Sequence, residues 1–237
     1  LKAAEWILGH NINSIEVKCS RIQSLLSPHS INRQINIFDI EKYKRYIEDG
    51  VLGSSSIALL AKSNIHPDTA KKFGCIEFQD GYYHDRMIFP IKDIDGQLKG
   101  FVATATQSLE KWLEFNPKII DREYKRERPT TKNDYRKVLY PNNFKVSHCL
   151  MGVDQFKKGD IVILVEGCRD VLKLRQEGFS GALGIGGTSL SDEQLLTLSK
   201  LSPKKLMIML DGDKGGREGA KRIVNKCLSL FREIFVI

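Results

Sequence analysis

The last third of the chain alternates short apolar runs with longer amphipathic segments. Apolar runs occupy residues 161–165, 181–185, 206–210 and 234–237. Runs this short and this free of polar positions are typical of strands that are covered on both faces. Each of the first three is followed by apolar residues at helical spacing, so strand and helix alternate strictly. This pattern predicts a parallel sheet with helices packed on its faces.

Local end signals support the three helices between these strands. The helix after residue 167 is expected to stop at Gly178, and the helix after residue 190 has Ser191 at its start and Gln194 three residues later. The second arrangement is the spacing of a capping box. The third helix is expected over 217–231, immediately after a stretch that reads DGDKGG.

The first half of the chain is less regular. Residues 1–26 and 39–73 are expected to be mainly helical, and 87–91 with 98–105 to form a β-hairpin around the turn dipeptide Asp95-Gly96. Residues 116–137 are polar and basic without an apolar period, which predicts a mobile loop or a nucleic-acid contact. We therefore divide the chain into an N-terminal helical segment (1–40), a basic mixed α+β subdomain (41–157) and a parallel-sheet domain (158–237).

Charge and cysteine content narrow the class of protein. The net charge is +8, of which residues 1–158 contribute +6, and this excess makes nucleic acid a reasonable partner. The five cysteines are scattered without a CxxC pair, which fits neither a zinc site nor a disulfide framework and favours a reducing compartment. No apolar run approaches the ~20 residues that span a bilayer. A cytoplasmic location is therefore expected.

Three carboxylates follow two of the predicted strands. Glu166 comes directly after the strand at 161–165, and Asp211 and Asp213 follow the strand at 206–210. Functional groups in a parallel α/β sheet gather at the carboxyl ends of its strands, so these side chains converge if the two strands are neighbours. Three hard oxygen ligands suit Mg²⁺ or Mn²⁺. The alternative is structural, because Asp-x-Asp after a strand can simply cap the next helix.

Two other motifs do not indicate sites. A calcium loop starting at Asp211 would need Asp or Asn at Gly215 and Glu at Arg222. The sequence GIGGTS (184–189) matches no phosphate-binding pattern and is interpreted as a sharp strand-to-helix turn.

Several stretches together resemble a known family. The sequences VEG…D (165–170), GTSLSDEQ (187–194) and LDGDKGGREGA (210–220) resemble the signature of a Toprim domain. Upstream, YYHDRMIFPIKDIDGQLKGFVATA (82–105) is similar to the segment that precedes Toprim in bacterial and phage DnaG-type primases, and KSNIHPDTAKKFGC (62–75) is similar to the helical segment before it. The resemblance runs from Lys62 to the C-terminus. It implies a Toprim-type parallel sheet flanked by helices, preceded by the mixed subdomain.

The resemblance also implies roles for single residues. Glu166, Asp211 and Asp213 would be catalytic metal-binding carboxylates, with Asp170 as a further metal ligand. Arg86, in DRMIFPI, would face the nucleotide or template, and Lys137, in RKVLYPNN, would contact phosphate or nucleic acid. Lys145 and Lys214 are expected to join them as nucleotide or nucleic-acid contacts. Solvated surface charge is the alternative for Arg86 and Lys137.

The chain departs from the family pattern in three respects. Primases of this type have a further acidic pair beyond the next strand, and the sequence ends at Ile237 before that position. They also have an N-terminal zinc-binding domain; LKAAEWILGH resembles the helix that ends it, so zinc is expected only in a domain absent from this chain. The segment around 109–136 is longer and more basic than in the family.

The leading hypothesis is a primase core that makes short RNA primers on single-stranded DNA by metal-dependent nucleotidyl transfer. Its partners would be the template, ribonucleoside triphosphates and a replicative helicase, in the cytoplasm at the replication fork, or in the host cytoplasm if a phage encodes it. Two alternatives stay open: a Toprim-type nuclease or topoisomerase-like enzyme, and a non-catalytic single-stranded DNA-binding module.

Overall fold

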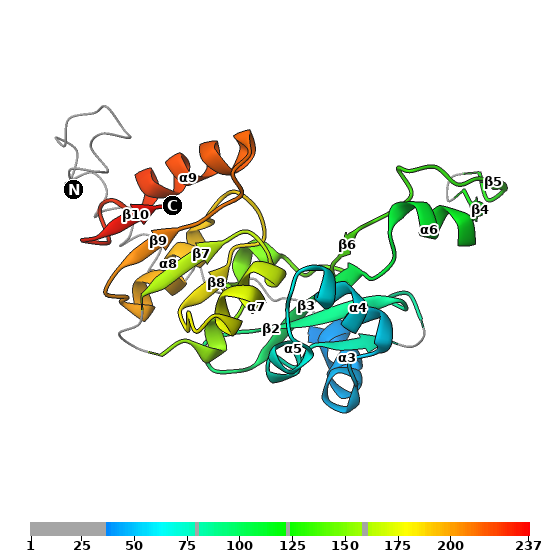
Figure 1. Ribbon diagram of the computed structural model, residues 1–237, viewed down its shortest axis with the longest axis horizontal. Helices are drawn as coiled ribbons and strands as arrows, with labels where there is room; N and C mark the ends of the chain where they lie inside the picture. The colour runs from blue at the N-terminus through cyan, green and yellow to red at the C-terminus, as the bar shows by residue number, and fades with distance from the viewer. Residues whose placement is uncertain (1–36, 79–80, 122–123, 158–160) are drawn as a thin grey trace.

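The computed structural model describes residues 37–78, 81–121, 124–157 and 161–237 (Figure 1). The N-terminal helical segment predicted at 1–40, with its helix at 1–26, therefore lies outside the described residues except for its last four positions. The first half of the described chain contains α3 (Ile37–Asp49), α4 (Ser54–Lys62), α5 (Pro67–Lys72), β1 (Ile76–Phe78), β2 (Arg86–Lys92), β3 (Leu98–Ala105), α6 (Leu109–Phe115), β4 (Lys118–Ile120), β5 (Glu127–Pro129), β6 (Val138–Leu139) and the 3₁₀ turns η2 (Val146–His148) and η3 (Val153–Gln155).

The predicted hairpin forms the centre of an antiparallel sheet. Strands β2 and β3 pair from Arg86 opposite Ala105, and the sheet has the order β1-β2-β3-β6. Gly96, at a φ of 79°, closes the hairpin by donating its N–H to the Asp93 carbonyl at 3.0 Å. Six consecutive residues of β2 are buried, because α4 and α5 contribute to the core on one face of the sheet and Tyr43 of α3 packs on the other. Burial on both faces explains why this strand is apolar throughout.

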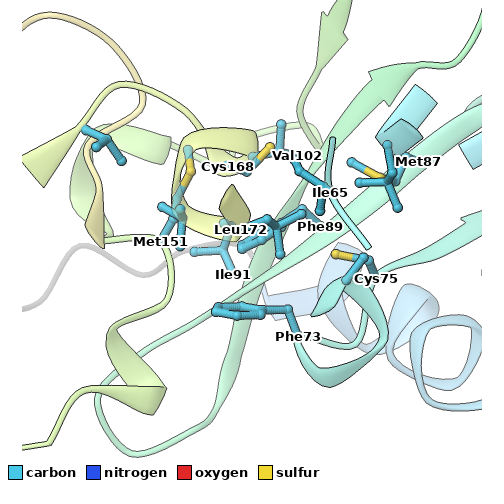
Figure 2. Close-up of a cluster of buried hydrophobic side chains, with 14 of the residues drawn as sticks. Ile65, Phe73, Cys75, Met87, Phe89, Ile91, Val102, Met151, Cys168 and Leu172 are labelled. Atoms are coloured by element: carbon cyan, nitrogen blue, oxygen red, sulfur yellow. The ribbon is translucent and has the colours of Figure 1, made fainter. Parts of the chain in front are cut away.

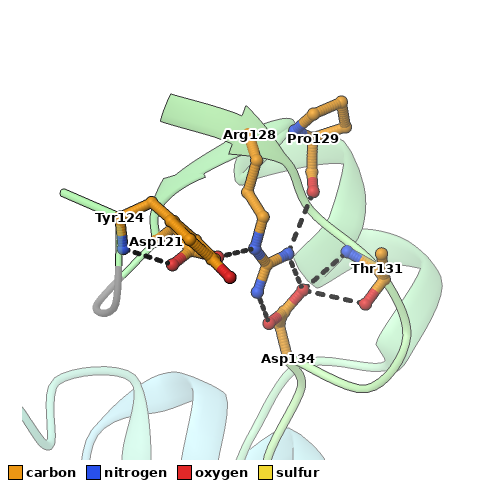
Figure 3. Close-up of polar contacts among 6 residues, drawn as sticks. All are labelled: Asp121, Tyr124, Arg128, Pro129, Thr131 and Asp134. Carbon is orange, nitrogen blue, oxygen red and sulfur yellow. Dashed lines mark hydrogen bonds and ion pairs between the residues drawn. The ribbon is translucent and has the colours of Figure 1, made fainter. Parts of the chain in front are cut away.

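Residues 107–121 and 124–137 form an arm, and two short strands within it interrupt the loop that was predicted at 116–137. Helix α6 starts at Ser108, whose hydroxyl accepts the Lys111 N–H at 3.3 Å, and β4 and β5 then pair as a short antiparallel hairpin. Figure 3 shows the polar contacts that hold its end together: Arg128 donates to Asp121 at 3.0 Å and to both oxygens of Asp134, at 2.9 and 2.6 Å. This part of the arm is therefore stabilised by a bidentate charge pair rather than by an apolar face, and so it could not be predicted from the hydrophobic pattern.

The second half forms the predicted parallel sheet. Its elements are β7 (Val162–Val165), α7 (Cys168–Gln176), β8 (Ala182–Gly184), α8 (Asp192–Leu201), β9 (Leu206–Ile208), α9 (Lys214–Cys227) and β10 (Ile234–Val236). The strand order is β10-β9-β7-β8, and all three pairings are parallel. The α/β fold class predicted from the sequence is confirmed.

The helices lie on opposite faces of this sheet (Figure 1). On β7, Ile163 and Val165 belong to a core shared with α7, whereas Val162 and Leu164 belong to a core shared with α8 and α9. The capping box at Ser191 is confirmed, since its hydroxyl accepts the Gln194 N–H at 3.0 Å. Helix α9 begins three residues earlier than predicted, because its cap is Asp213 rather than a residue nearer Arg217.

One apolar cluster joins the two halves. Phe73, Phe89 and Ile91 of the antiparallel half pack in the same cluster as Cys168 and Leu172 of the parallel half (Figure 2). Sequence periodicity shows that each element has an apolar face but not which element covers it. The shared cluster fixes the position of the antiparallel sheet beside α7. In the described residues no helix is long and apolar enough to cross a membrane.

Candidate active site

The two strands that carry the acidic residues are neighbours, as the sequence hypothesis required. Strands β7 and β9 pair in parallel register, with Leu164 opposite Ile208. Beyond this pair the Met209 N–H still donates to the Leu164 carbonyl at 2.9 Å. The Asp211 N–H then donates to Oε1 of Glu166 at 3.0 Å. The Glu166 side chain thus meets the backbone of Asp211, 45 positions later in the sequence, at one edge of the sheet.

The remaining two carboxylates lie at the starts of helices. Oδ1 of Asp213 accepts the Gly216 N–H at 2.8 Å and so caps α9. Oδ2 of Asp170 accepts the Gly167 N–H at 3.0 Å in the first turn of α7. The cap interpretation of the Asp-x-Asp motif is therefore correct for Asp213. The cap leaves further hydrogen-bond acceptor positions of Asp213 free, because a carboxylate has two oxygens and about four acceptor positions.

The four acidic residues form a region of uncompensated negative charge. Burial raises the pKa of Glu166, and the neighbouring charges of Asp211, Asp213 and Asp170 raise it further, against the hydrogen bond from the Asp211 N–H. Within the described residues, the ion pairs of lysines and arginines go to other carboxylates. Repulsion of this kind is relieved by a bound cation.

The arrangement fits a hydrated divalent cation rather than a closed protein cage. In the part of the chain that the structure describes, no three Asp, Glu, His or Cys side chains converge closely enough to enclose a metal. Mg²⁺ is commonly held by one or two carboxylates and completes its coordination with water and substrate phosphate. Glu166, which is partly buried and accepts the Asp211 N–H, and Asp211, which is exposed, are suited to this mode of binding.

Glycines let the backbone pack closely around these side chains. A Cβ on Gly216 would lie 1.9 Å from the Asp211 carbonyl oxygen, so α9 can start this close to the acidic turn only with glycine there. The GIGGTS segment is the sharp turn between β8 and α8 that the sequence predicted. Gly186 has a φ of 76° in this turn and donates its N–H to the Glu166 carbonyl at 2.9 Å.

Two of the predicted basic contacts lie at this edge of the sheet. Lys214 is exposed and is the first residue of α9, directly after Asp213. Lys145 is exposed and directly precedes Val146. The Val146 side chain packs on Gly186, where a Cβ would lie 2.7 Å from its Cγ2 atom. Both ammonium groups therefore come from segments that border the acidic residues.

The other two predicted contacts lie in the antiparallel half. Arg86 is buried, with 9% of its surface exposed, and its guanidinium donates to the carbonyls of Ala103 at 3.5 Å and Lys137 at 3.4 Å. The Lys137 carbonyl also accepts the Ala105 N–H at 2.8 Å, while the Lys137 side chain is exposed. The sequence hypothesis did not foresee that backbone contacts join these two residues.

Arg86 also lines an open hollow of about 1070 Å³ between the antiparallel sheet and the arm. The arm side of this hollow, including Trp112 and Phe115, was not predicted from the sequence. The WLEF stretch after Ser108 could have indicated an amphipathic helix, but nothing in the sequence links it to Arg86.

Comparisons with known proteins identify relatives of this chain. Residues 160–236 match the Toprim domain family. The chain is 30% identical over 155 residues to a DNA primase of Chlamydia pneumoniae, an alignment that covers 64% of this chain and 23% of that protein. It is 25% identical over 206 residues to a DNA primase of Synechococcus elongatus, covering 82% of this chain and 26% of that protein. The chain thus spans about a quarter of the length of these curated relatives.

Solved structures show the same fold. The zinc binding and RNA polymerase domains of the Aquifex aeolicus primase superpose with a TM-score of 0.63 at 20% identity, covering 99% of this chain and 63% of that one. The RNA polymerase domain of Mycobacterium tuberculosis primase DnaG superposes with a TM-score of 0.54 at 19% identity, covering 94% of this chain and 73% of that one. Residues 160–236 are therefore similar to the Toprim domain family, and the chain is similar in sequence to segments of DNA primases and in fold to primase RNA polymerase domains.

Proposed function

We propose that this chain is the nucleotidyl-transfer core of a DnaG-type primase, which makes short RNA primers on single-stranded DNA. The observation that carries the proposal is the contact between Glu166 and the Asp211 backbone, which assembles an uncompensated acidic edge within a Toprim fold. The curated relatives that match parts of this chain are DNA primases. Domain boundaries at 41–157 and 158–237 are part of the same proposal.

The carboxylates would act by holding and orienting a divalent cation. Glu166 and Asp211 would bind Mg²⁺ or Mn²⁺ directly, and Asp213 and Asp170 would hold its coordinated waters with the oxygens that their helix caps leave free. Once bound, the ion neutralises triphosphate charge and polarises the attacked phosphorus. Because phosphoryl transfer needs little covalent help from protein, positioning and electrostatics by these side chains would account for most of the rate.

The basic residues would bind the polyanionic substrates. Lys145 and Lys214, which border the acidic edge, are suited to triphosphate oxygens. Arg86 and Lys137 lie in the antiparallel half, where a template strand could be held by its backbone. A structure of the Mycobacterium tuberculosis domain is in complex with double-stranded DNA, which agrees with a nucleic-acid role. The proposed activity places the protein at the replication fork in the cytoplasm, with a replicative helicase as its partner.

The test is incorporation of labelled ribonucleotides on single-stranded DNA with Mg²⁺ or Mn²⁺, with and without an annealed primer. Glu166→Gln, Asp211→Asn and Asp213→Asn remove charge but keep the shape, and Asn at position 213 can still cap α9. Glu177→Gln, at the opposite end of α7, is the matched control. Incorporation that survives in Glu177→Gln and is lost in the other three supports the proposal.

The alternatives give different outcomes in the same preparations. A Toprim-type nuclease or topoisomerase-like enzyme would cut or relax supercoiled plasmid in Mg²⁺ without incorporating ribonucleotides. A binding module would retain single-stranded DNA in all four variants and incorporate nothing. Either result would refute the primase assignment for this chain.

A further inference from the structure

The arm leaves apolar and aromatic side chains exposed around the hollow. Helix α6 buries none of its residues, and Phe115 and Ile120 are 64% and 61% exposed. Trp112 lies half-buried against Tyr135, with ring centroids 5.6 Å apart and an interplanar angle of 55°. Folding alone gives no reason for an arm to collect aromatic groups that it does not bury. These side chains are therefore suited to contact a ligand.

Polar contacts within the arm nevertheless join its segments to one another. Arg128 joins Asp121 to Asp134 (Figure 3), and the Tyr135 hydroxyl donates to the Gln107 carbonyl at 2.7 Å. Arg128 offsets one of these two negative charges. Over the whole lining, the three arginines (Arg86, Arg128 and Arg136) balance the three aspartates (Asp85, Asp121 and Asp134). The aromatic groups are thus presented on a preorganised support, which lowers the entropic cost of binding.

The opposite wall of the hollow carries a buried cation without a counter-ion. Arg86 lines the hollow, is nine-tenths buried, and forms none of the ion pairs found among the described residues. Its two hydrogen bonds to carbonyls are long, at 3.4 and 3.5 Å. Burial lowers the pKa of its guanidinium. A buried charge of this kind is expensive unless an anion reaches it, and Arg136 adds a second cation to the lining.

Aromatic side chains and an arginine that line the same hollow match the chemistry of a flat base linked to a phosphate. The volume of about 1070 Å³ admits a nucleotide unit with room for its neighbours. We infer that the hollow between the arm and the antiparallel sheet receives one base of a single-stranded nucleic acid, stacked on Trp112, with the adjacent phosphate at Arg86. This inference rests on the proposed function for the identity of the strand, and it assigns the arm the task of retaining that strand beside the active site.

Tryptophan fluorescence provides a direct test, because the chain contains only two tryptophans, Trp6 and Trp112. In a Trp6→Phe protein all tryptophan emission comes from Trp112. Oligo(dT) is expected to quench this emission at the same concentrations at which its own anisotropy rises. An abasic oligonucleotide of equal length should bind by charge without quenching, and ATP alone distinguishes a free nucleotide from a strand.

Variants separate a stacking role from a structural one. Trp112→Ala should weaken oligo(dT) binding by roughly tenfold or more, and Trp112→Phe should restore most of it. Phe179→Ala, which removes an aromatic side chain that is 50% exposed in the parallel half, is the control and should bind normally. Arg86→Met should weaken binding of oligo(dT) and of the abasic strand alike. Its melting temperature should not fall, because the variant no longer buries an unpaired charge.

The outcomes distinguish the two proposals. Strand binding without quenching of Trp112 overturns the inference about the arm, even if ribonucleotide incorporation is normal. Quenching by ATP but not by oligo(dT) also overturns it, in favour of a free-nucleotide site. Quenching by oligo(dT) without any incorporation supports the arm site and refutes the primase assignment.

Discussion

Gly216 is the residue at which the acidic edge is most sensitive to a single methyl group. In Gly216→Ala the new Cβ would lie 1.9 Å from the Asp211 carbonyl oxygen, 2.8 Å from its carbonyl carbon and 3.0 Å from its nitrogen. All three atoms belong to the backbone, so no side chain can rotate away to make room. Either the start of α9 or the turn that holds Asp211 has to move.

The required movement can be worked out from these distances. The shortest one has to grow from 1.9 Å to about 3.0 Å, a shift of about 1.1 Å. Glycine to alanine inside a helix normally stabilises by about 1 kcal/mol, whereas forced overpacking costs about 1–3 kcal/mol or more. We therefore expect a net loss of stability. Because Mg²⁺ tolerates little distortion and a 1 Å misplacement can lower a rate about 10²-fold, activity should fall further than stability.

Gly212→Ala is the matched control. A Cβ on Gly212 meets no atom within 4 Å, although this glycine lies between the two aspartates. Melting temperature, Mn²⁺ binding by calorimetry and ribonucleotide incorporation should be close to normal in Gly212→Ala and reduced in Gly216→Ala. If Gly216→Ala matched the unchanged protein in all three measurements, the close packing of α9 against Asp211 would be wrong.

Three further predictions follow from the core, the acidic edge and the hairpin. Leu172→Ala, in the shared cluster, should lower the free energy of unfolding in urea by about 2–5 kcal/mol while the two halves still unfold in one transition; separate transitions would contradict the shared core. Glu166→Gln should not lower the melting temperature without metal, because it removes a negative charge that the neighbouring aspartates repel. The rise in melting temperature on adding Mg²⁺ should disappear in this variant. A rise that persists would exclude Glu166 as a ligand. The pKa of Asp93 lies below its ordinary 3.8, because hydrogen bonds from Lys99 and Gln97 outweigh the effect of burial. The stabilisation by ionised Asp93 is therefore present above pH 3.8 and is lost as the pH falls through the lower pKa of the folded state. Between about pH 5 and 2, the melting temperature of Asp93→Asn should change less than that of the unchanged protein. Equal changes in the two proteins would contradict this prediction.

Local patterns predicted most of the parallel half correctly. Burial on both faces leaves an apolar run at each of the strands β7, β8, β9 and β10. The capping box at Ser191 and the helix stop at Gly178 depend on interactions within a few residues. The two short strands of the arm were not predicted, because the contacts in this segment are polar ones between Arg128 and two carboxylates rather than an apolar face. A segment held together by charge pairs has the same amino-acid composition as a solvated loop. The sequence therefore does not distinguish the two.

The site divides along the same line. The sequence determined which carboxylates follow the strands and that glycines surround them, because these features are local. Only the tertiary structure decided that β7 lies beside β9, so that Glu166 meets Asp211, and that Arg86 and Trp112 line the same hollow. Strand order and the packing of the arm depend on contacts between distant residues, whose free energy is shared over many side chains and leaves no signal at any one position.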